Sequence, residues 1–280
     1  MRFDTHCHTK EGSPDGKVPL SDYVDLLAEK GYDGMIVTDH DTYNGYREWK
    51  YAKQFSSHPD FVVIKGIEYD TIDGGHILVI MPDDRPLKIL EFRGLPLQTL
   101  IELVHRNGGI LGPAHPCGEK HLSLTNTARY RHHTDIMKKF DFIEGYNPCE
   151  SRESNEKATT YGRFFDLPCF GGSDAHKEEC IGHAYTDFPV DIHTANDLID
   201  YVRQAHFGST AFGGHPYRGT TKEKLGPLNK ILVEGFWFYN RFASIYRRHK
   251  RIHELHYLHS FQPILTMMRR QNSKHSPNAQ

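Results

Sequence analysis

Short apolar runs alternate, over residues 1–215, with longer segments in which apolar positions recur every three or four residues. The short runs are typical of buried β-strands, and the longer spacing is typical of amphipathic helices. The runs predict strands at Phe3–Thr5, Met35–Thr38, Phe61–Ile67, His76–Met81, Ile110–Ala114, Phe142–Tyr146 and Cys169–Gly172, with a short last one at Ser209–Gly213. The helical spacing predicts helices that begin near Ser21, Tyr46, Leu97, Ser154 and Ala195.

This alternation predicts an α/β fold with a mainly parallel sheet, either open or closed into a barrel. The turn Asp73-Gly74-Gly75 should join the third and fourth strands as a hairpin. A polar stretch from Arg218 to Pro227 indicates a boundary. We therefore expect a domain over residues 1–225, an aromatic and basic helical extension over 226–270, and a disordered tail over 271–280.

Composition excludes several classes of protein. Of the 280 residues, 38% are hydrophobic and 25% are charged, as in ordinary globular proteins. Neither an apolar run of eighteen residues nor a signal peptide is recognisable, so we expect no membrane span. The five cysteines are irregularly spaced and form no C-x-x-C motif, which favours reduced thiols and a cytoplasmic location.

Candidate chemistry begins at His6 and His8. Residues two apart on a strand point to the same side, so these imidazoles make half of a site for Zn²⁺, Mn²⁺ or Fe²⁺. Seven further His, Asp or Glu residues fall at predicted strand ends or in the loops just after them. The complete set is His6, His8, Asp15, His40, Glu68, His76, His115, Asp174 and His176. Active sites of α/β barrels assemble at such ends, which predicts one metal cluster.

Short motifs around these residues resemble the PHP (polymerase and histidinol phosphatase) superfamily. They are His6-x-His8, Thr38-Asp39-His40-Asp41, Gly66-Ile67-Glu68, Gly75-His76, Ala114-His115-Pro116 and Gly172-Ser173-Asp174-Ala175-His176. The resemblance covers about residues 1–215 and implies a distorted (β/α)7 barrel. It also implies that the nine residues hold a trinuclear centre of Mn²⁺, Fe²⁺ or Zn²⁺, or at least two such ions, that hydrolyses phosphoesters. Glu68 would bridge two ions, and Glu68, His76 and Asp174 are expected to act in catalysis.

The residue types suit this chemistry independently of the resemblance. Metal ions about 3.5–4 Å apart lower the pKa of bound water and hold both the attacking and the departing oxygen. A hydroxide that bridges two ions is therefore the expected nucleophile. The sequence has no Ser-His-Asp or Cys-Arg motif that would demand a side-chain nucleophile.

Contacts to the substrate are less constrained by the sequence. Asn147, Arg152, Lys177 and His183 are our candidates, and Arg131 and Arg163 compete for the phosphate. Asp39 and Asp41 flank His40, where they would either orient its imidazole or cap the following helix. Four histidines of the extension, His249, His253, His256 and His259, stretch over about 15 Å of helix, too far for one ion.

We predict a metal-dependent phosphoesterase acting on a small phosphomonoester. A nuclease, exonuclease or nucleotide phosphatase at the same site is the first alternative, since eight Lys or Arg and one acid lie between Arg241 and Gln280. A non-catalytic metal-binding module is a second, although none of the expected ligands is missing. An amidohydrolase-type C–N hydrolase is a third, but the segments 38–41 and 174–176 fit it poorly. The substrate, the metals and the oligomeric state are left open.

Overall fold

The computed structural model describes residues 1–119 and 122–217, together with separate helical residues between 232 and 253. The strands are β1 (Arg2–Cys7), β2 (Gly34–Val37), β3 (Val62–Asp70), β4 (His76–Ile80), β5 (Ile110–Pro113), β6 (Ile143–Tyr146), β7 (Cys169–Gly171), β8 (Ala184–Asp187) and β9 (Ala211–Gly214). The helices are α1 (Leu20–Glu29), α2 (Asn44–Ala52), α3 (Leu97–Arg106), α4 (Ala128–His132), α5 (Arg152–Phe165) and α6 (Ala195–Val202).

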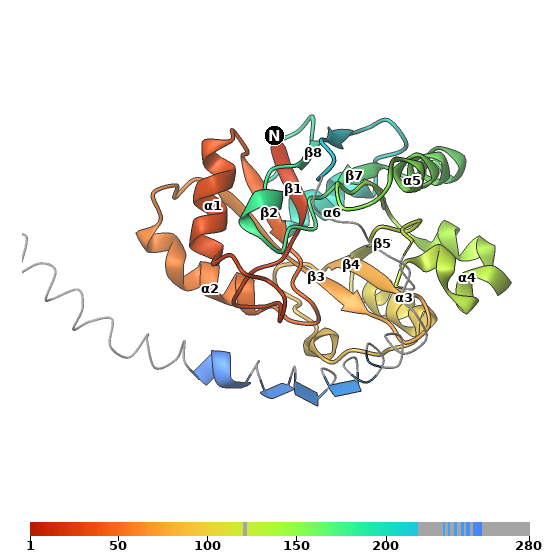
Figure 1. Ribbon diagram of the computed structural model, residues 1–280, viewed down its shortest axis with the longest axis horizontal. Coiled ribbons are helices and arrows are strands. Elements are labelled where there is room, and N and C mark those ends of the chain that lie inside the picture. Colours follow the sequence, from red (N-terminus) through yellow and green to blue (C-terminus); the bar gives the residue numbers. More distant parts are fainter. Residues whose placement is uncertain are drawn as a thin grey trace, which may run out of the picture.

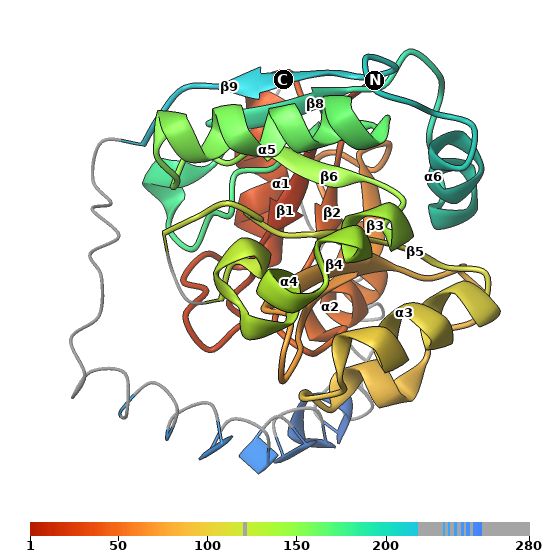
Figure 2. The same ribbon diagram turned by 90° about the vertical axis from the view of Figure 1, so that its right-hand side faces the viewer.

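Seven strands form a curled mixed sheet in the order β5-β4-β3-β2-β1-β8-β9, and β6 pairs with β7 in a second sheet. In Figure 1, α1 and α2 lie on one side of the central strands, and α3, α4 and α5 lie on the other. Helix α5 packs along β6, as Figure 2 shows. The predicted α/β fold of the barrel type is confirmed.

The sheet is mixed, because two of its strands, β4 and β8, run against the other five. β1, β2 and β3 are parallel, whereas β4 is antiparallel to both β3 and β5. The antiparallel direction of β4 follows from the predicted hairpin. β8 pairs antiparallel with β1 and with β9. β8 was absent from the prediction because the short sequence Ala-Tyr-Thr-Asp has no apolar run.

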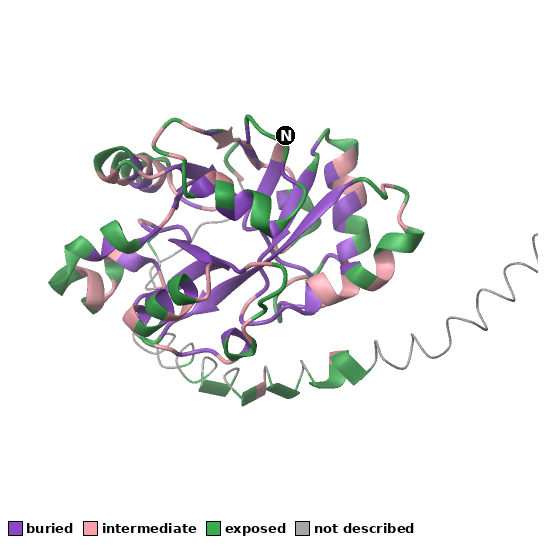
Figure 3. Ribbon diagram, turned by 180° about the vertical axis from the view of Figure 1, so that it is seen from behind, coloured by how far each residue is buried: buried purple, intermediate pink, exposed green. Residues whose placement is uncertain are grey.

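Both faces of the central strands are buried, as the purple strands in Figure 3 show. Ile67 and Val79 belong to a core cluster with Leu100 and Val104 of α3. Ile64 of β3 faces a different cluster, to which Leu198 of α6 contributes. Because successive side chains of a strand point to opposite faces, burial of both faces requires the continuous apolar runs seen in the sequence.

The strand directions bring the candidate ligands to one edge of the sheet. The carboxyl ends of β1, β2 and β3 meet there because these strands are parallel. β4 runs the other way, and its first residue, His76, pairs with Asp70 at the end of β3. The loop after β7 joins the same edge through a bridge between Cys7 and Ala175.

The expected extension over residues 226–270 is described only in part, and the predicted tail over 271–280 lies outside the described residues. Arg251 of the extension forms an ion pair with Glu48 of α2. In the part of the chain that the structure describes, none of the helices is both long and apolar enough to span a membrane. The cytoplasmic location stays a prediction.

Candidate metal centre

The Glu68 carboxylate lies at the centre of the cluster and is only 1% exposed. Its Oε1 atom lies 2.8 Å from His76 Nδ1, 3.2 Å from His115 Nε2 and 3.5 Å from His6 Nε2. Its Oε2 atom lies 3.0 Å from His40 Nδ1 and 3.3 Å from His8 Nε2. The two oxygens therefore face different sets of imidazoles, as a carboxylate that bridges two cations must.

Three overlapping groups of ligand atoms, each with its atoms within 4.8 Å of one another, are arranged around this carboxylate. They are His6 with His8 and Glu68, His40 with Glu68 and His76, and His8 with His40 and His176. Asp174 Oδ1 lies 3.4 Å from His8 Nε2, and Asp15 Oδ2 lies 3.2 Å from His176 Nε2. All nine predicted ligands are thus brought together.

Five of the six imidazoles contact a protein group through the ring nitrogen that faces away from the cluster. These contacts join His6 Nδ1 to Glu144 Oε1 (2.8 Å), His8 Nδ1 to Ser13 Oγ (2.9 Å), His76 Nε2 to Asp70 Oδ1 (2.5 Å), His115 Nδ1 to Ser123 Oγ (3.3 Å) and His176 Nδ1 to the Asp174 carbonyl (2.9 Å). Histidines that bind metals characteristically hold their second nitrogen in this way, which fixes the tautomer and the ring.

The tautomers of His6 and His8 test whether cations fit here. Glu144 accepts from His6 Nδ1, so the proton of a neutral ring is on that nitrogen. Ser13 Oγ donates to Asp39 and therefore accepts from His8 Nδ1. Both Nε2 atoms then direct lone pairs into the cluster, where they lie 3.1 Å apart. Two such lone pairs repel each other unless a proton or a metal ion binds them, so the donor set fits divalent metal ions, which would replace the protons.

Buried atoms of the group formed by His40, Glu68 and His76 also indicate that a cation fits here. His40 Nδ1, His76 Nδ1 and Glu68 Oε2 have no hydrogen-bond partner of suitable geometry among the described residues. Burying polar atoms without a partner is costly, and such atoms are rare in folded proteins. A cation between them would satisfy all three.

The electrostatics of the protein alone also favour positive charge in the cluster. Burial opposes protonation of His6 and His8, but neighbouring carboxylates outweigh it. They raise the pKa of His6 well above its ordinary value and that of His8 to about 9. Burial disfavours the charged form of Glu68, yet the surrounding histidines keep its pKa well below the usual range. For His40, burial prevails and lowers the pKa to about 4. Protons or metal ions must therefore balance the carboxylates.

Strained backbone occurs at the two ligands that follow β5 and β7. His115 has φ 29° and Asp174 has φ 51°, a region that residues other than glycine seldom adopt. Such strain persists only where the surroundings impose it, and it is concentrated at functional sites. At His115 the surroundings include Glu144, whose Oε2 accepts from the His115 backbone N–H at 2.5 Å.

Glycine is needed where the loop after β7 passes His6. A Cβ atom on Gly172 would lie 2.3 Å from the Cβ atom of His6 and 2.8 Å from its backbone nitrogen. Only a residue without a side chain lets these two ligand-bearing segments approach so closely.

The two carboxylates that flank His40 contact other residues. Asp39 accepts from Thr9 N, Ser13 Oγ and Gly45 N, so it acts on His8 through Ser13 and also binds the start of α2. Asp41 accepts from Asp70 N and pairs with Arg93. Sequence reasoning missed Arg93 and Glu144, because long-range contacts bring them to the cluster. It also missed Asp70, which reaches His76 across the β3–β4 hairpin.

The candidate substrate contacts have varied positions. Asn147 is buried, and its Nδ2 atom lies 3.2 Å from both Glu144 Oε2 and Asp174 Oδ2. Arg152 is exposed and bonds to Glu156 on its own helix. Lys177 is exposed and directly follows His176. His183 is partly exposed, and its Nδ1 atom lies 3.2 Å from the His215 carbonyl.

Solved structures with a similar fold include a candidate metal-dependent phosphoesterase from Bifidobacterium adolescentis, with a TM-score of 0.52 and 16% identity over 63% of this chain and 88% of that one. A complex of endonuclease Q with a 27-mer duplex that carries an abasic lesion has a TM-score of 0.52 and 17% identity over 83% of this chain and 66% of that one. At these identities the likeness concerns the fold.

Among curated proteins, the chain is 28% identical over 150 residues to a PolC-type DNA polymerase III of Staphylococcus epidermidis. That match covers 49% of this chain and 10% of the polymerase, so the chain spans only a small part of such relatives. The family model for the PHP domain matches residues 4–165, and a PHP-associated model matches residues 152–206. The first match covers more than half of the chain, and the protein belongs to the PHP domain family.

Proposed function

We propose that the protein is a metal-dependent phosphoesterase that hydrolyses a small phosphomonoester with two or three divalent ions. The observation that carries the proposal is the Glu68 carboxylate, which lies among the imidazoles of five histidines with each oxygen facing its own set. Membership of the PHP family and the fold shared with the candidate metal-dependent phosphoesterase from Bifidobacterium adolescentis support it.

Glu68, Asp174 and Asp15 would hold the ions as anionic ligands, and the six histidines would be the other ligands. Ions bound here would lower the pKa of water and offset the negative charge of a phosphate. His6 and His8 are fully buried, whereas the side chains of His176 and Asp15 are 28% and 58% exposed. The substrate therefore reaches the cluster from the side of His176 and Asp15, where Lys177 is available for a phosphate oxygen.

Hydrolysis of p-nitrophenyl phosphate with Mn²⁺ tests the proposal. The wild-type protein should cleave it, and Glu68→Gln should abolish cleavage because the amide loses the charge between the two sets of imidazoles. Glu91→Gln is the matched control, because Glu91 is equally buried and pairs with Arg47 instead. Full activity in Glu68→Gln would refute the role of the Glu68 carboxylate. Metal binding without any hydrolysis by wild type would refute the enzyme and favour a non-catalytic module.

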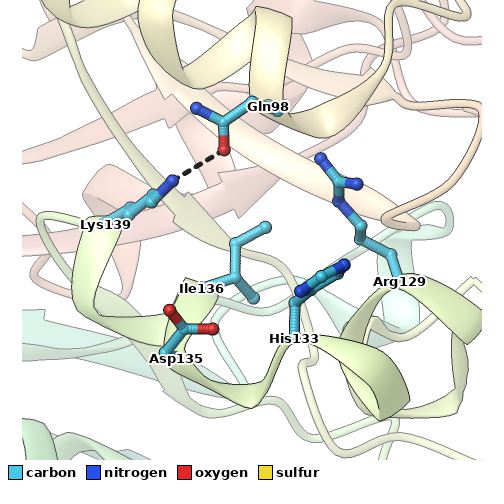
Figure 4. Close-up of a pocket in the computed structure, with 6 residues that line it drawn as sticks. All are labelled: Gln98, Arg129, His133, Asp135, Ile136 and Lys139. Atoms are coloured by element: carbon cyan, nitrogen blue, oxygen red, sulfur yellow. Dashed lines mark hydrogen bonds between the residues drawn. The ribbon is translucent and has the colours of Figure 1, made fainter.

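A nuclease is the second candidate, and a surface hollow between α3 and α4 favours it. Figure 4 shows the hollow, which is lined by Gln98, Arg129, His133, Asp135, Ile136 and Lys139. Three of these side chains can carry positive charge, and such charges bind the phosphates of a nucleic acid irrespective of sequence. Arg129 Nε lies 3.7 Å from Asp73, in the turn that leads to His76.

Cleavage of a short oligonucleotide distinguishes the two candidates. For a nuclease, replacing Arg129 and Lys139 together by Ala should reduce oligonucleotide cleavage and its salt dependence, and leave p-nitrophenyl phosphate hydrolysis unchanged. Lys138→Ala, an exposed lysine beside the hollow, is the control. For a phosphomonoesterase, neither substitution should affect either substrate.

A further inference from the structure

Arg93 forms a buried ion-pair fork beside the candidate metal centre. The residue lies between Lys88–Glu91, a short 3₁₀ helix, and α3, and it is 5% exposed. Its Nη2 atom lies 2.7 Å from Asp41 Oδ2, and its Nη1 atom lies 2.9 Å from Asp70 Oδ2. One guanidinium therefore joins two carboxylates from separate segments of the chain, which its planar geometry suits.

Each of these carboxylates is adjacent to one candidate ligand. Asp41 directly follows His40, has φ 50°, and accepts from Asp70 N through Oδ1 at 2.9 Å. Asp70 Oδ1 lies 2.5 Å from His76 Nε2, while His76 Nδ1 faces Glu68 at 2.8 Å. Arg93 thereby links the turn at His40 to the ring of His76.

We propose that Arg93 is a positioning residue for the ion held by His40, Glu68 and His76. This inference rests on the metal centre proposed above. Without the guanidinium, Asp41 and Asp70 would be two buried carboxylates facing each other, and unpaired buried charges of one sign force their surroundings to rearrange. The rearrangement would displace His40 and His76, whose nitrogens belong to the same group of ligands.

Loss of Arg93 should affect only one ion, because other residues hold the remaining ligand histidines. The rings of His6 and His8 are held by Glu144 and Ser13, which lie on other segments of the chain. Loss of Arg93 should therefore weaken one class of ion and spare the ion held by His6, His8 and Glu68. A residue that served general stability alone would weaken both classes equally.

Arg47 provides a matched control. Its Nη1 and Nη2 atoms lie 2.5 and 2.7 Å from the two oxygens of Glu91, which is 2% exposed. Glu91 in turn accepts from the backbone N–H of Tyr43. Arg47→Met thus removes a partly buried Arg–carboxylate fork that contacts none of the nine candidate ligands.

The test measures Mn²⁺ affinity of the full chain by chelator competition and by the electron paramagnetic resonance signal of Mn²⁺. Arg93→Met should lower the affinity for one class of Mn²⁺ ion tenfold or more, which is the effect typical of residues that orient ligands. The affinity for the other class should stay within twofold of wild type. The affected class should be the one that His76→Ala lacks. Arg47→Met should leave both classes within twofold, and added guanidinium should restore the affected class in an Arg93→Ala variant.

Equal affinities in Arg93→Met and Arg47→Met, or an equal loss in both classes, would overturn the inference. If circular dichroism shows that Arg93→Met is unfolded, Arg93→Lys decides. A single ammonium cannot span both carboxylates, so the affected class should weaken at least threefold, and a change under twofold overturns the inference. Wild-type protein that binds Mn²⁺ in two classes but hydrolyses no phosphoester would refute the proposed function and leave the role of Arg93 standing. Wild-type protein with a single class of ion would refute the role of Arg93.

Discussion

His6 Nδ1 lies 2.8 Å from Glu144 Oε1, and both side chains are essentially buried. The other oxygen of Glu144 accepts from the backbone N–H of His115 and from Asn147 Nδ2. One carboxylate from β6 therefore fixes the ring of a ligand on β1 and the backbone of a ligand after β5. Asn147 extends the same contact to Asp174.

Replacing Glu144 by Gln should weaken metal binding and hydrolysis by about 10–100-fold, the range typical of groups that orient ligand histidines. The amide keeps the shape of the side chain but removes the charge that fixes the His6 tautomer. The affinity for Mn²⁺ and kcat/KM for p-nitrophenyl phosphate are the measurements. Glu91→Gln controls for loss of a buried carboxylate, and an equal effect of the two substitutions would contradict the role of Glu144.

Ser13→Ala should destabilise the protein by about 1–3 kcal/mol, because His8 Nδ1 loses its acceptor and Asp39 loses a donor in a buried environment. Urea unfolding of the metal-free protein measures this cost. Ser21→Ala, at an exposed position on α1, should stay within about 0.5 kcal/mol of wild type. A Ser13→Ala variant as stable as Ser21→Ala would show that the contact contributes nothing.

Chelation should lower the melting temperature of the wild-type protein. A ligand that binds only the folded state stabilises it by about 2.7 kcal/mol when its concentration is 100 times its dissociation constant. Differential scanning calorimetry with Mn²⁺ and with a chelator gives the difference. The difference should be much smaller in Glu68→Gln, because the carboxylate shared by two of the ligand groups is gone. An equal shift in both proteins would place the stabilising ions elsewhere.

The nine candidate ligands could be predicted from the sequence because each lies at a strand end or in the loop just after one. All except Asp15 also belong to a short local motif. The strands bring these motifs together whatever the exact topology, so the omission of β8 from the prediction did not affect the set. The residues that support the ligands carry no such signal. Arg93 lies far along the chain from Asp41, and only the fold brings the two together.

Neighbourhood in sequence left two roles open for Asp39 and Asp41, which flank His40 and would either orient its imidazole or cap the following helix. Successive residues at a strand end point in different directions. Asp39 accepts from Gly45 N at the start of α2 and supports His8 through Ser13, whereas Asp41 binds Arg93. Arg152 is exposed at the start of α5, where the sequence alone does not reveal which way the helix faces.

Metal affinity should rise with pH and be lost in acid. The surrounding carboxylates overcome burial and raise the pKa of His8 in the metal-free protein to about 9, and they also raise that of His6. These shifts favour the protonated imidazoles at pH 7, whereas only the deprotonated form binds a metal, so binding must release protons. Below pH 9 each drop in pH should therefore weaken Mn²⁺ binding.

Calorimetric titration in buffers of different ionisation enthalpy measures the proton release at pH 7. Ser13→Ala, which removes the acceptor at His8 Nδ1, should change the release, whereas Ser21→Ala should not. Binding at pH 7 without proton release would mean that the carboxylates do not hold protons on these histidines.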